Sequence, residues 1–174
     1  MKFISTPLSG AYLIEPEPRE DGRGAFFRSF CQEEFLAHGL DFMTVQCNVS
    51  ENHINGTLRG MHFQKDPFSE IKLMRCVSGA VFDVAVDLRP DSETYLKWHG
   101  VELTAKNRLA FYVPANFAHG YLTLEDNSAV FYQVSEFYHP EAESGIRWND
   151  PKIGIEWPFA PVVVSDKDRD WGLL

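Results

Sequence analysis

The sequence is poor in three features that would each mark a class of protein: long apolar runs, cysteine and positive charge. No segment approaches the roughly 20 apolar residues of a transmembrane helix. The first stretch, MKFISTPLSGAYLIEPEP, has neither an unbroken apolar segment nor a small-residue cleavage site, so it does not resemble a signal peptide. The three cysteines, Cys31, Cys47 and Cys76, lack the spacing of a metal site. We therefore expect a cytoplasmic protein with reduced, buried thiols and no contact with a membrane.

Basic residues are scarce relative to acidic ones. Sixteen Lys and Arg against 25 Asp and Glu give the chain a formal net charge of −9. A general binder of nucleic acid or of an anionic membrane normally has the opposite balance, so we expect neither partner. An acidic protein can still bind an anionic small molecule, but it must gather its few arginines at one place to do so.

Apolar and aromatic side chains are abundant and occur in short alternating runs. They make up 44% and 14% of the 174 residues, which is enough for one domain, 1–174, with a substantial core. Alternation with a period of two predicts two strands within 72–89 that turn near Ser78 and Gly79. Further strands are expected in HGVELTA, RLAFYVP, HGYLTLED and SAVFYQVSEFY. Only 31–39 has a helical pattern, with Phe35 and Leu36 on one face.

Many short strands with hardly any helix predict an all-β fold, and we expect a jelly-roll (cupin-like) barrel with a few short helices. A barrel of this kind directs alternate side chains into a central cavity, so polar residues at inward positions become candidates for a site. The last third of the chain is rich in Pro and Gly and is expected to wrap the barrel as irregular structure.

The histidines do not follow the pattern of a metal-binding jelly roll. Such proteins typically carry two histidines one residue apart, then a Glu, and a third histidine in the second half. Here the first half offers His62, with Gln64 where a second histidine would lie, and the second half offers His119 alone. Two histidines without a convergent carboxylate rarely hold a catalytic metal, so no metal is expected.

The surroundings of His62 favour catalysis over a histidine that merely packs. Arg59 lies three residues before it and Lys72 ten after it, both in strand-like runs that lead to the same cavity. His119 occupies the matching place in the other half of the barrel, and Tyr132 falls on a further strand. Histidine, lysine, tyrosine and a carboxylate together supply what enolisation needs: a base, a group that stabilises the enolate and a proton donor.

Six segments, in order, closely resemble the dTDP-4-dehydrorhamnose 3,5-epimerase family. They are RGAFFRSF, TLRGMHFQ, IKLMRCVSGAVFDVAVDLRPDSETY, YVPANFAHGYLTL, VFYQVSEFYHPEAESGIRWNDPKIGIEWP and SDKD. The likeness runs from about Leu13 to Asp168, nearly the whole chain. It implies a cofactor-independent isomerase that inverts C3 and C5 of a nucleotide-linked 4-keto-6-deoxyhexose, and a homodimer.

The resemblance also implies roles for individual residues. The catalytic set is His62 as base, Asp168 as the carboxylate paired with it, Tyr132 as the acid on the opposite face of the sugar, and Lys72 near the 4-keto oxygen. The substrate-binding set is Arg23 and Arg59 at the diphosphate, with Phe26, Gln46, Asn48, His119 and Tyr138. The residues alone leave three assignments open. Asp166 and Asp170 compete with Asp168, Tyr132 could be a core aromatic, and Arg23 could be a turn residue.

The chain departs from the family pattern at two places. QCNVS stands where QDNHS is common, so Cys47 and Val49 replace an acid and a histidine; RGAFFR places Arg28 where an acid is common. We expect these changes to fall around the nucleotide and sugar pocket. They leave other readings open: a different nucleotide, epimerisation at C3 or C5 only, a ketoisomerase, a sugar-binding cupin without catalysis, or a metal-dependent cupin.

Overall fold

The structure, a computed structural model, describes all 174 residues. Fourteen strands and two short helices follow one another along the chain. The strands are β1 Lys2–Ser5, β2 Tyr12–Glu15, β3 Arg19–Asp21, β4 Gly24–Phe26, β5 Gln46–Asn52, β6 Thr57–Gln64, β7 Lys72–Ser78, β8 Ala80–Asp87, β9 Trp98–Thr104, β10 Ala110–Val113, β11 Phe117–Thr123, β12 Ser128–Val134, β13 Glu143–Gly145 and β14 Val163–Val164; the helices are α1 Gln32–Ala37 and α2 Asp166–Asp170.

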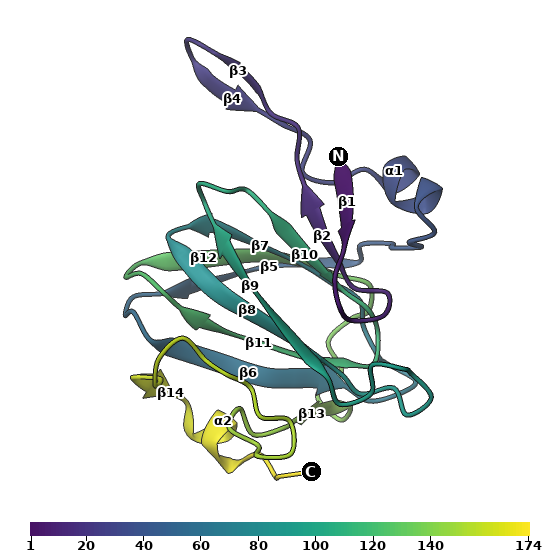
Figure 1. Cartoon of the computed structure of the whole chain (residues 1–174), viewed down its shortest axis with the longest axis vertical. Helices are drawn as coiled ribbons and strands as arrows, with labels where there is room; N and C mark the ends of the chain where they lie inside the picture. The colour runs from purple at the N-terminus through teal and green to yellow at the C-terminus, as the bar shows by residue number, and fades with distance from the viewer.

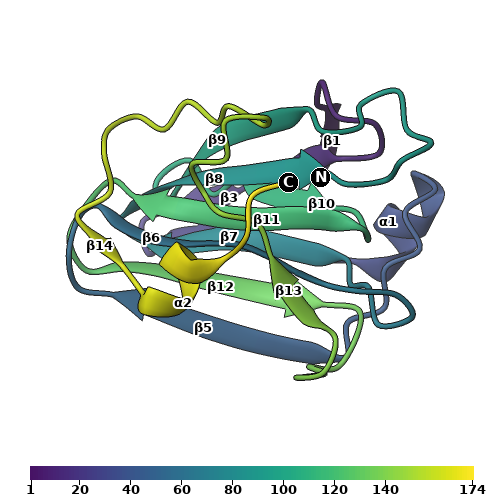
Figure 2. The same ribbon diagram turned by 90° about the horizontal axis from the view of Figure 1, so that it is seen from below.

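Two sheets face each other and form the body of the protein (Figure 1). One has the strand order β1-β2-β10-β7-β12-β5, and the other β13-β6-β11-β8-β9, with β14 added beside β6. Only β14 is parallel to its neighbour. The C-terminal segment crosses the outer side of β6 and β11, which places β13, β14 and α2 there (Figure 2). The all-β jelly-roll barrel expected from the alternating pattern is confirmed.

The strands predicted from alternation are present, and the exceptions have physical reasons. Strands β7 and β8 turn at Gly79, whose φ of 68° is a conformation that glycine adopts without strain. In α1, Phe35 is fully buried whereas Leu36 is 49% exposed, so the prediction that they share a face is wrong. Neighbouring residues in a helix point about 100° apart and cannot both face the core. Cys47 is exposed, which contradicts the expectation of buried thiols for that residue.

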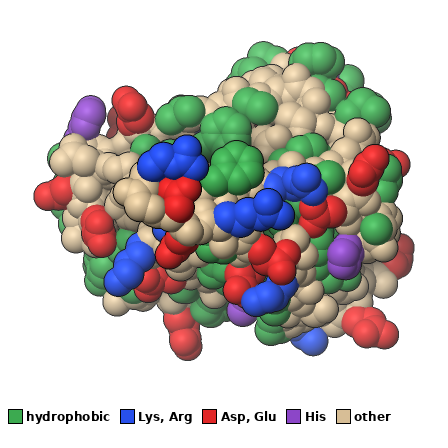
Figure 3. Space-filling view, turned by 90° about the horizontal axis from the view of Figure 1, so that it is seen from above, with side chains coloured by type: hydrophobic (Ala, Val, Ile, Leu, Met, Phe, Trp, Pro, Cys, Tyr) green, Lys and Arg blue, Asp and Glu red, His purple; other side chains and the backbone are tan.

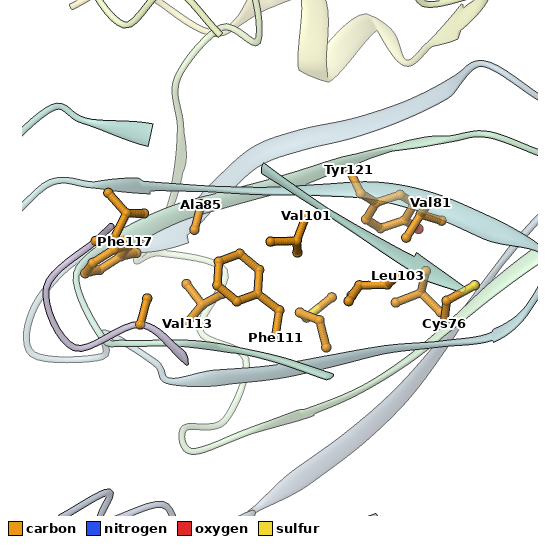
Figure 4. Close-up of a cluster of buried hydrophobic side chains, with 13 residues drawn as sticks. Cys76, Val81, Ala85, Val101, Leu103, Phe111, Val113, Phe117 and Tyr121 are labelled. Carbon is orange, nitrogen blue, oxygen red and sulfur yellow. The ribbon is translucent and has the colours of Figure 1, made fainter. Parts of the chain in front are cut away.

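A core of 13 buried residues fills the space between the two sheets (Figure 4). Phe111 and Leu103 lie at its centre, and each fully buried apolar side chain of this size contributes roughly 1.5–3 kcal/mol. Met74 and Tyr121 belong both to this core and to the wall of a cavity described below. The cavity therefore borders directly on the core between the sheets.

Strands β6 and β11 approach each other unusually closely at Gly60 and Gly120, beside the histidines of both strands. A Cβ on Gly60 would lie 2.6 Å from the Cα of Gly120, and the φ of Gly60 is +131°. A Cβ on Gly120 would lie 2.7 Å from the carbonyl oxygen of Arg59. The paired glycines thus allow the backbone contact that sets the spacing of the two strands.

Gly60→Ala is expected to destabilise the protein markedly, because the new methyl group has no room and the backbone conformation suits only glycine. The two effects together should lower the free energy of unfolding by roughly 2–5 kcal/mol. Thermal unfolding of purified protein measures this loss. Gly22→Ala is the matched control, since no atom lies within 4 Å of a Cβ at Gly22. Equal melting temperatures for the two variants would contradict the prediction.

The molecular surface has a mixed charge. Viewed from the end of the molecule that carries β3 and β4, lysine and arginine side chains alternate with aspartate and glutamate side chains, and apolar side chains lie between them (Figure 3). Neither helix of the protein has the length and apolar character needed to cross a membrane.

Candidate active site

Two adjoining pockets lie between the sheets and share three side chains: those of His62, Lys72 and Tyr132. The larger, with a volume of about 360 Å³, is also lined by Gln46, Asn48, Phe63, Gln64, Glu70, Val134, Tyr138 and Glu143. The smaller, of about 230 Å³, is also lined by Ser50, Arg59, Met74, His119 and Tyr121. The shared residues therefore mark the middle of one continuous polar site.

His62 lies on β6 and is hydrogen-bonded to a carboxylate that comes from the far end of the chain. Its Nε2 is 2.5 Å from Oδ1 of Asp168, whose side chain is only 4% exposed. Oδ2 of Asp168 also accepts a hydrogen bond from the backbone N–H of Gly60. Burial alone raises the pKa of Asp168, but the hydrogen bond and charge of His62 outweigh it, and the pKa lies below the ordinary value. Asp168 is therefore an ionised partner that can orient the imidazole and stabilise its cation.

The structure distinguishes Asp168 from the neighbouring acids that the residue pattern left in competition with it. Asp166 is 94% exposed and pairs with Arg169, and Asp170 is exposed as well. Asp168 alone of the three is buried, because the first turn of α2 directs it toward β6. Its position is fixed further by Ser165, whose Oγ accepts a hydrogen bond from the backbone N–H of Asp168.

A second histidine–carboxylate pair lies on the neighbouring strands. His119 on β11 is directly opposite His62 in the strand register, and its Nε2 is 2.7 Å from Oδ1 of Asp83 on β8. Burial raises the pKa of Asp83, and the charge and hydrogen bond of His119 oppose this shift. His119 lines the smaller pocket but is 95% buried, so it offers much less ring surface to the cavity than His62 does.

Tyr132 faces the same cavity from the opposite sheet. It lies on β12, whereas His62 lies on β6 of the other sheet. Burial raises the pKa of the Tyr132 hydroxyl above its ordinary value, so the group stays protonated at neutral pH. Its hydroxyl makes no hydrogen bond within the protein and is free to donate to a bound molecule.

Lys72 begins β7 and projects into the part of the cavity that both pockets share. Its Nζ donates a hydrogen bond to Oε1 of Glu70 at 2.6 Å, and the two side chains are only 12% and 11% exposed. An ammonium group has three donors, so Lys72 keeps hydrogen-bonding capacity for an oxygen in the cavity.

The remaining cavity residues among the predicted binding set are held by neighbours. Arg59 donates from Nε to Oδ1 of Asn52 at 2.8 Å. Gln46 donates from Nε2 to Oδ1 of Asn48 at 3.1 Å, and both line the larger pocket. Tyr138 lies at the edge of that pocket, where its hydroxyl donates to Glu143.

Arg23 and Phe26 are the two predicted binding residues that the fold does not bring to the cavity. Both belong to the hairpin of β3 and β4, which extends away from the body of the chain (Figure 1). The Arg23 side chain is 90% exposed and pairs only with Asp21, and Phe26 is 76% exposed. Neither residue lines the two pockets that contain His62.

Two charged residues of the cavity, Glu70 and Glu143, were not identified from the sequence. Glu70 lies two positions before Lys72, so the strand period that directs Lys72 inward could have indicated it. Glu143 had no such signal, since β13 is only three residues long and lies in a segment expected to be irregular.

The positions at which the chain departs from the family pattern lie outside the cavity, contrary to expectation. Cys47 and Val49 lie on the face of β5 opposite to Gln46 and Asn48, and both are exposed. Arg28 pairs with Glu34 at 2.6 Å, also away from the cavity. Side chains alternate between the faces of a strand, so residues that are adjacent in QCNVS have unrelated surroundings.

No three side chains of His, Cys, Asp or Glu come together as a group that could hold a metal ion. The polar groups of the cavity are instead a base with its carboxylate, a protonated hydroxyl and an ammonium. This set can move protons at carbon and stabilise negative charge on an oxygen.

Comparison with known proteins agrees with this chemistry. The sequence model of the dTDP-4-dehydrorhamnose 3,5-epimerases matches residues 5–174. The chain is 48% identical over 173 residues to the dTDP-4-dehydrorhamnose 3,5-epimerase of Methanothermobacter thermautotrophicus, which covers 98% of this chain and 92% of that protein. The chain belongs to the dTDP-4-dehydrorhamnose 3,5-epimerase family.

Solved structures of this family and of related epimerases have the same fold. The dTDP-4-dehydrorhamnose 3,5-epimerase of Bacillus anthracis, with TDP and PPi bound, is similar with a TM-score of 0.96 and 42% identity, over 99% of each chain. A 3'-monoepimerase of Streptomyces bikiniensis in complex with dTDP-quinovose is similar with a TM-score of 0.91 and 34% identity, over 98% of this chain and 86% of the other. The fold thus occurs with both double and single epimerisation.

Proposed function

We propose that the protein is the epimerase that converts dTDP-4-dehydro-6-deoxyglucose into dTDP-4-dehydrorhamnose by inverting C3 and C5, a step in deoxysugar and polysaccharide biosynthesis. One arrangement carries the proposal: His62 and Tyr132 line a single cavity from opposite sheets, and Lys72 lines the part that both pockets share. Inversion at carbon needs a base on one face of the sugar and an acid on the other, and this cavity offers both.

The reaction follows from the acidity of carbon next to a ketone. Nε2 of His62 is engaged by Asp168, so Nδ1 removes the proton at C3 or C5, and the electron pair moves onto the C4 oxygen as an enolate. Lys72 donates a hydrogen bond to that oxygen as it gains charge. Tyr132 then delivers a proton to the opposite face of the same carbon, and the ketone re-forms.

The proposal that the substrate carries a nucleotide diphosphate rests on Arg59 and on the ligands bound by related enzymes. Arg59 lines the smaller pocket, where a guanidinium can bind a diphosphate through paired hydrogen bonds. The Bacillus anthracis enzyme holds TDP and PPi, and the Streptomyces bikiniensis enzyme holds dTDP-quinovose. The free cysteines fit the reducing cytoplasm that we propose as the location of the enzyme.

Incubation with dTDP-4-keto-6-deoxyglucose in deuterated water tests the function directly. Deuterium should appear at both C3 and C5, with rhamno-configured product. Deuterium at one carbon only would indicate a single-centre epimerase, and transfer of the keto group from C4 to C3 would indicate a ketoisomerase. Binding without exchange would identify a sugar-binding cupin and overturn the proposal.

We propose further that the protein is a homodimer in which each chain extends its hairpin to the cavity of the other. Arg23 and Phe26 are so exposed that they do not form a ligand site within one chain, but in a dimer they can contact the ligand bound in the partner's cavity. The outer face of the β5 sheet also exposes Val49 and Val77, by 62% and 49%, which suits a second copy. Light scattering at micromolar concentration should give twice the 19.9 kDa of the chain. A monomeric mass would contradict this assembly.

Substrate affinity is expected to depend on Arg59 and, through the partner, on Arg23. Losing a charged hydrogen bond of about 1.5–3 kcal/mol should raise KM roughly 10–100-fold for Arg59→Ala, with a smaller effect on kcat. Arg23→Ala should also raise KM, because a protein with a net charge of −9 has little other positive charge for a diphosphate. Lys106→Ala, which removes an exposed positive charge on the turn before β10, is the control. If both arginine variants keep the KM of the wild type, the diphosphate binds elsewhere.

A further inference from the structure

The carboxylate that orients His62 belongs to a segment with little secondary structure of its own. Asp168 lies in α2, a helix of five residues, and β14 before it has two. Helices this short are not stable by themselves. The position of Asp168 must therefore depend on contacts that its flanking residues make with the barrel.

Trp171 makes one of these contacts, three residues after Asp168. Its indole lies against the backbone of Gly145 on β13: a Cβ on Gly145 would be 2.4 Å from Cε2 and 2.5 Å from Nε1 of the ring. Only glycine leaves room for the ring at this place. The Nε1 of Trp171 is buried without a hydrogen-bond partner, so the ring acts through packing and through the ammonium of Lys167, which lies 5.9 Å from the ring centroid.

Gly145 is itself next to the catalytic strand. In the pairing of β13 with β6, Gly145 is directly opposite His62, and Glu143 is opposite Gln64. Glu143 accepts a hydrogen bond from Lys167, the residue before Asp168. Strand β13 thus contacts residues on both sides of Asp168 while it pairs with the strand that carries His62.

We propose that the contact between Trp171 and Gly145 holds the Asp168 carboxylate against His62, which makes Trp171 and Gly145 positioning residues for the reaction. The inference rests on the proposed function, since it concerns the base of that reaction. Without the indole, the segment that carries Asp168 loses its packing contact with Gly145 of β13, and the carboxylate samples positions beyond hydrogen-bonding reach of Nε2. A misplacement of about 1 Å at a catalytic group can cost around 10²-fold in rate.

A double-mutant cycle tests whether Trp171 acts through Asp168. Trp171→Ala should lower kcat roughly 10–100-fold with KM changed less than about threefold. In an Asp168→Asn background the same substitution should change kcat by less than about twofold, because misplacing a carboxylate that has been removed has no further effect. Gly145→Ala, which keeps the indole but displaces it, should show the same pattern. Trp171→Phe, which keeps a flat ring, should recover most of the activity.

Leu173→Ala removes an apolar side chain from the same segment and should leave kcat unchanged, because Leu173 is 51% exposed. Equal losses from Trp171→Ala in both backgrounds, or none in the wild-type background, would overturn the proposal. If Trp171→Ala fails to fold, Gly145→Ala decides the matter by the same cycle.

Amide hydrogen exchange separates this inference from the proposed function, since it needs no turnover. The backbone N–H of Asp168 donates a hydrogen bond to Oγ of Ser165 at 3.1 Å, and the backbone N–H of Arg169 donates one to the carbonyl oxygen of Ser165 at 3.1 Å. These hydrogen bonds protect both N–H groups from exchange with solvent. Both should exchange at least tenfold faster in Trp171→Ala and Gly145→Ala than in the wild type or in Leu173→Ala. Unchanged exchange would show that the segment stays docked without the indole, and the inference would be wrong even if the enzyme is active.

Discussion

His62→Ala should abolish both the uptake of deuterium from solvent and the formation of epimerised product. No enolate forms without a base, so every later step is lost together. The loss should be at least the roughly 10²–10⁴-fold typical of a general base. Rates of deuterium incorporation at C3 and C5, read by NMR in deuterated water, measure it. His53→Ala is a suitable control, because His53 is exposed and lies outside both pockets.

The competing base for this reaction is His119, and the two histidines differ in their surroundings. Nε2 of His119 is engaged by Asp83, and its side chain is only 6% exposed, against 34% for His62. If His62→Ala still exchanges deuterium, His119 is the base and its own alanine variant should then lose exchange. The greater exposure of His62 to the shared part of the cavity is the reason for placing it first.

Alternation along the strands could predict most of the barrel, and it could also indicate which side chains meet in its cavity. His62, Lys72 and Tyr132 lie on β6, β7 and β12. The strand pattern indicated that His62 and Lys72 lead to one cavity, but it left open that Tyr132 is a core aromatic. The pairing of strands was not predictable in the same way, since it depends on contacts between distant segments. Local pattern specifies the face of a strand but not its neighbour.

The residues whose positions were predicted least well lie outside the regular strands, where side chains do not alternate between two faces. Asp168 was indistinguishable from Asp166 and Asp170 by pattern alone, because one helical turn in an irregular segment decides which of them is buried. The hairpin of β3 and β4 was expected at the substrate through Arg23 and Phe26, but it extends away from the cavity of its own chain. Such features follow from tertiary or quaternary packing, which a local sequence pattern does not encode.

The surroundings of Tyr132 also bear on why a tyrosine suits the role of acid. Its pKa is raised by burial, and the nearby charge of Glu70 adds to that effect. The hydroxyl is therefore protonated throughout the neutral range and gives a proton more readily than it accepts one. A competing tyrosine, Tyr121, lies on β11 in the same sheet as His62, and its hydroxyl donates to Ser50 at 2.8 Å. Asn52 also donates a hydrogen bond to this hydroxyl, at 3.3 Å, so the Tyr121 hydroxyl is engaged by two residues of β5 and is a poorer candidate for the acid than Tyr132.

Tyr132→Phe should therefore separate two signals that His62→Ala removes together. His62 can still take a proton from the sugar and return one to the same face, so deuterium uptake should continue at a substantial fraction of the wild-type rate. Net inversion should fall much further, by roughly the 10²–10⁴-fold of a lost general acid. Deuterium content and product configuration are read from the same samples, and Tyr121→Phe should reduce neither selectively. Equal losses of exchange and inversion in Tyr132→Phe would mean that His62 and Tyr132 do not act on opposite faces.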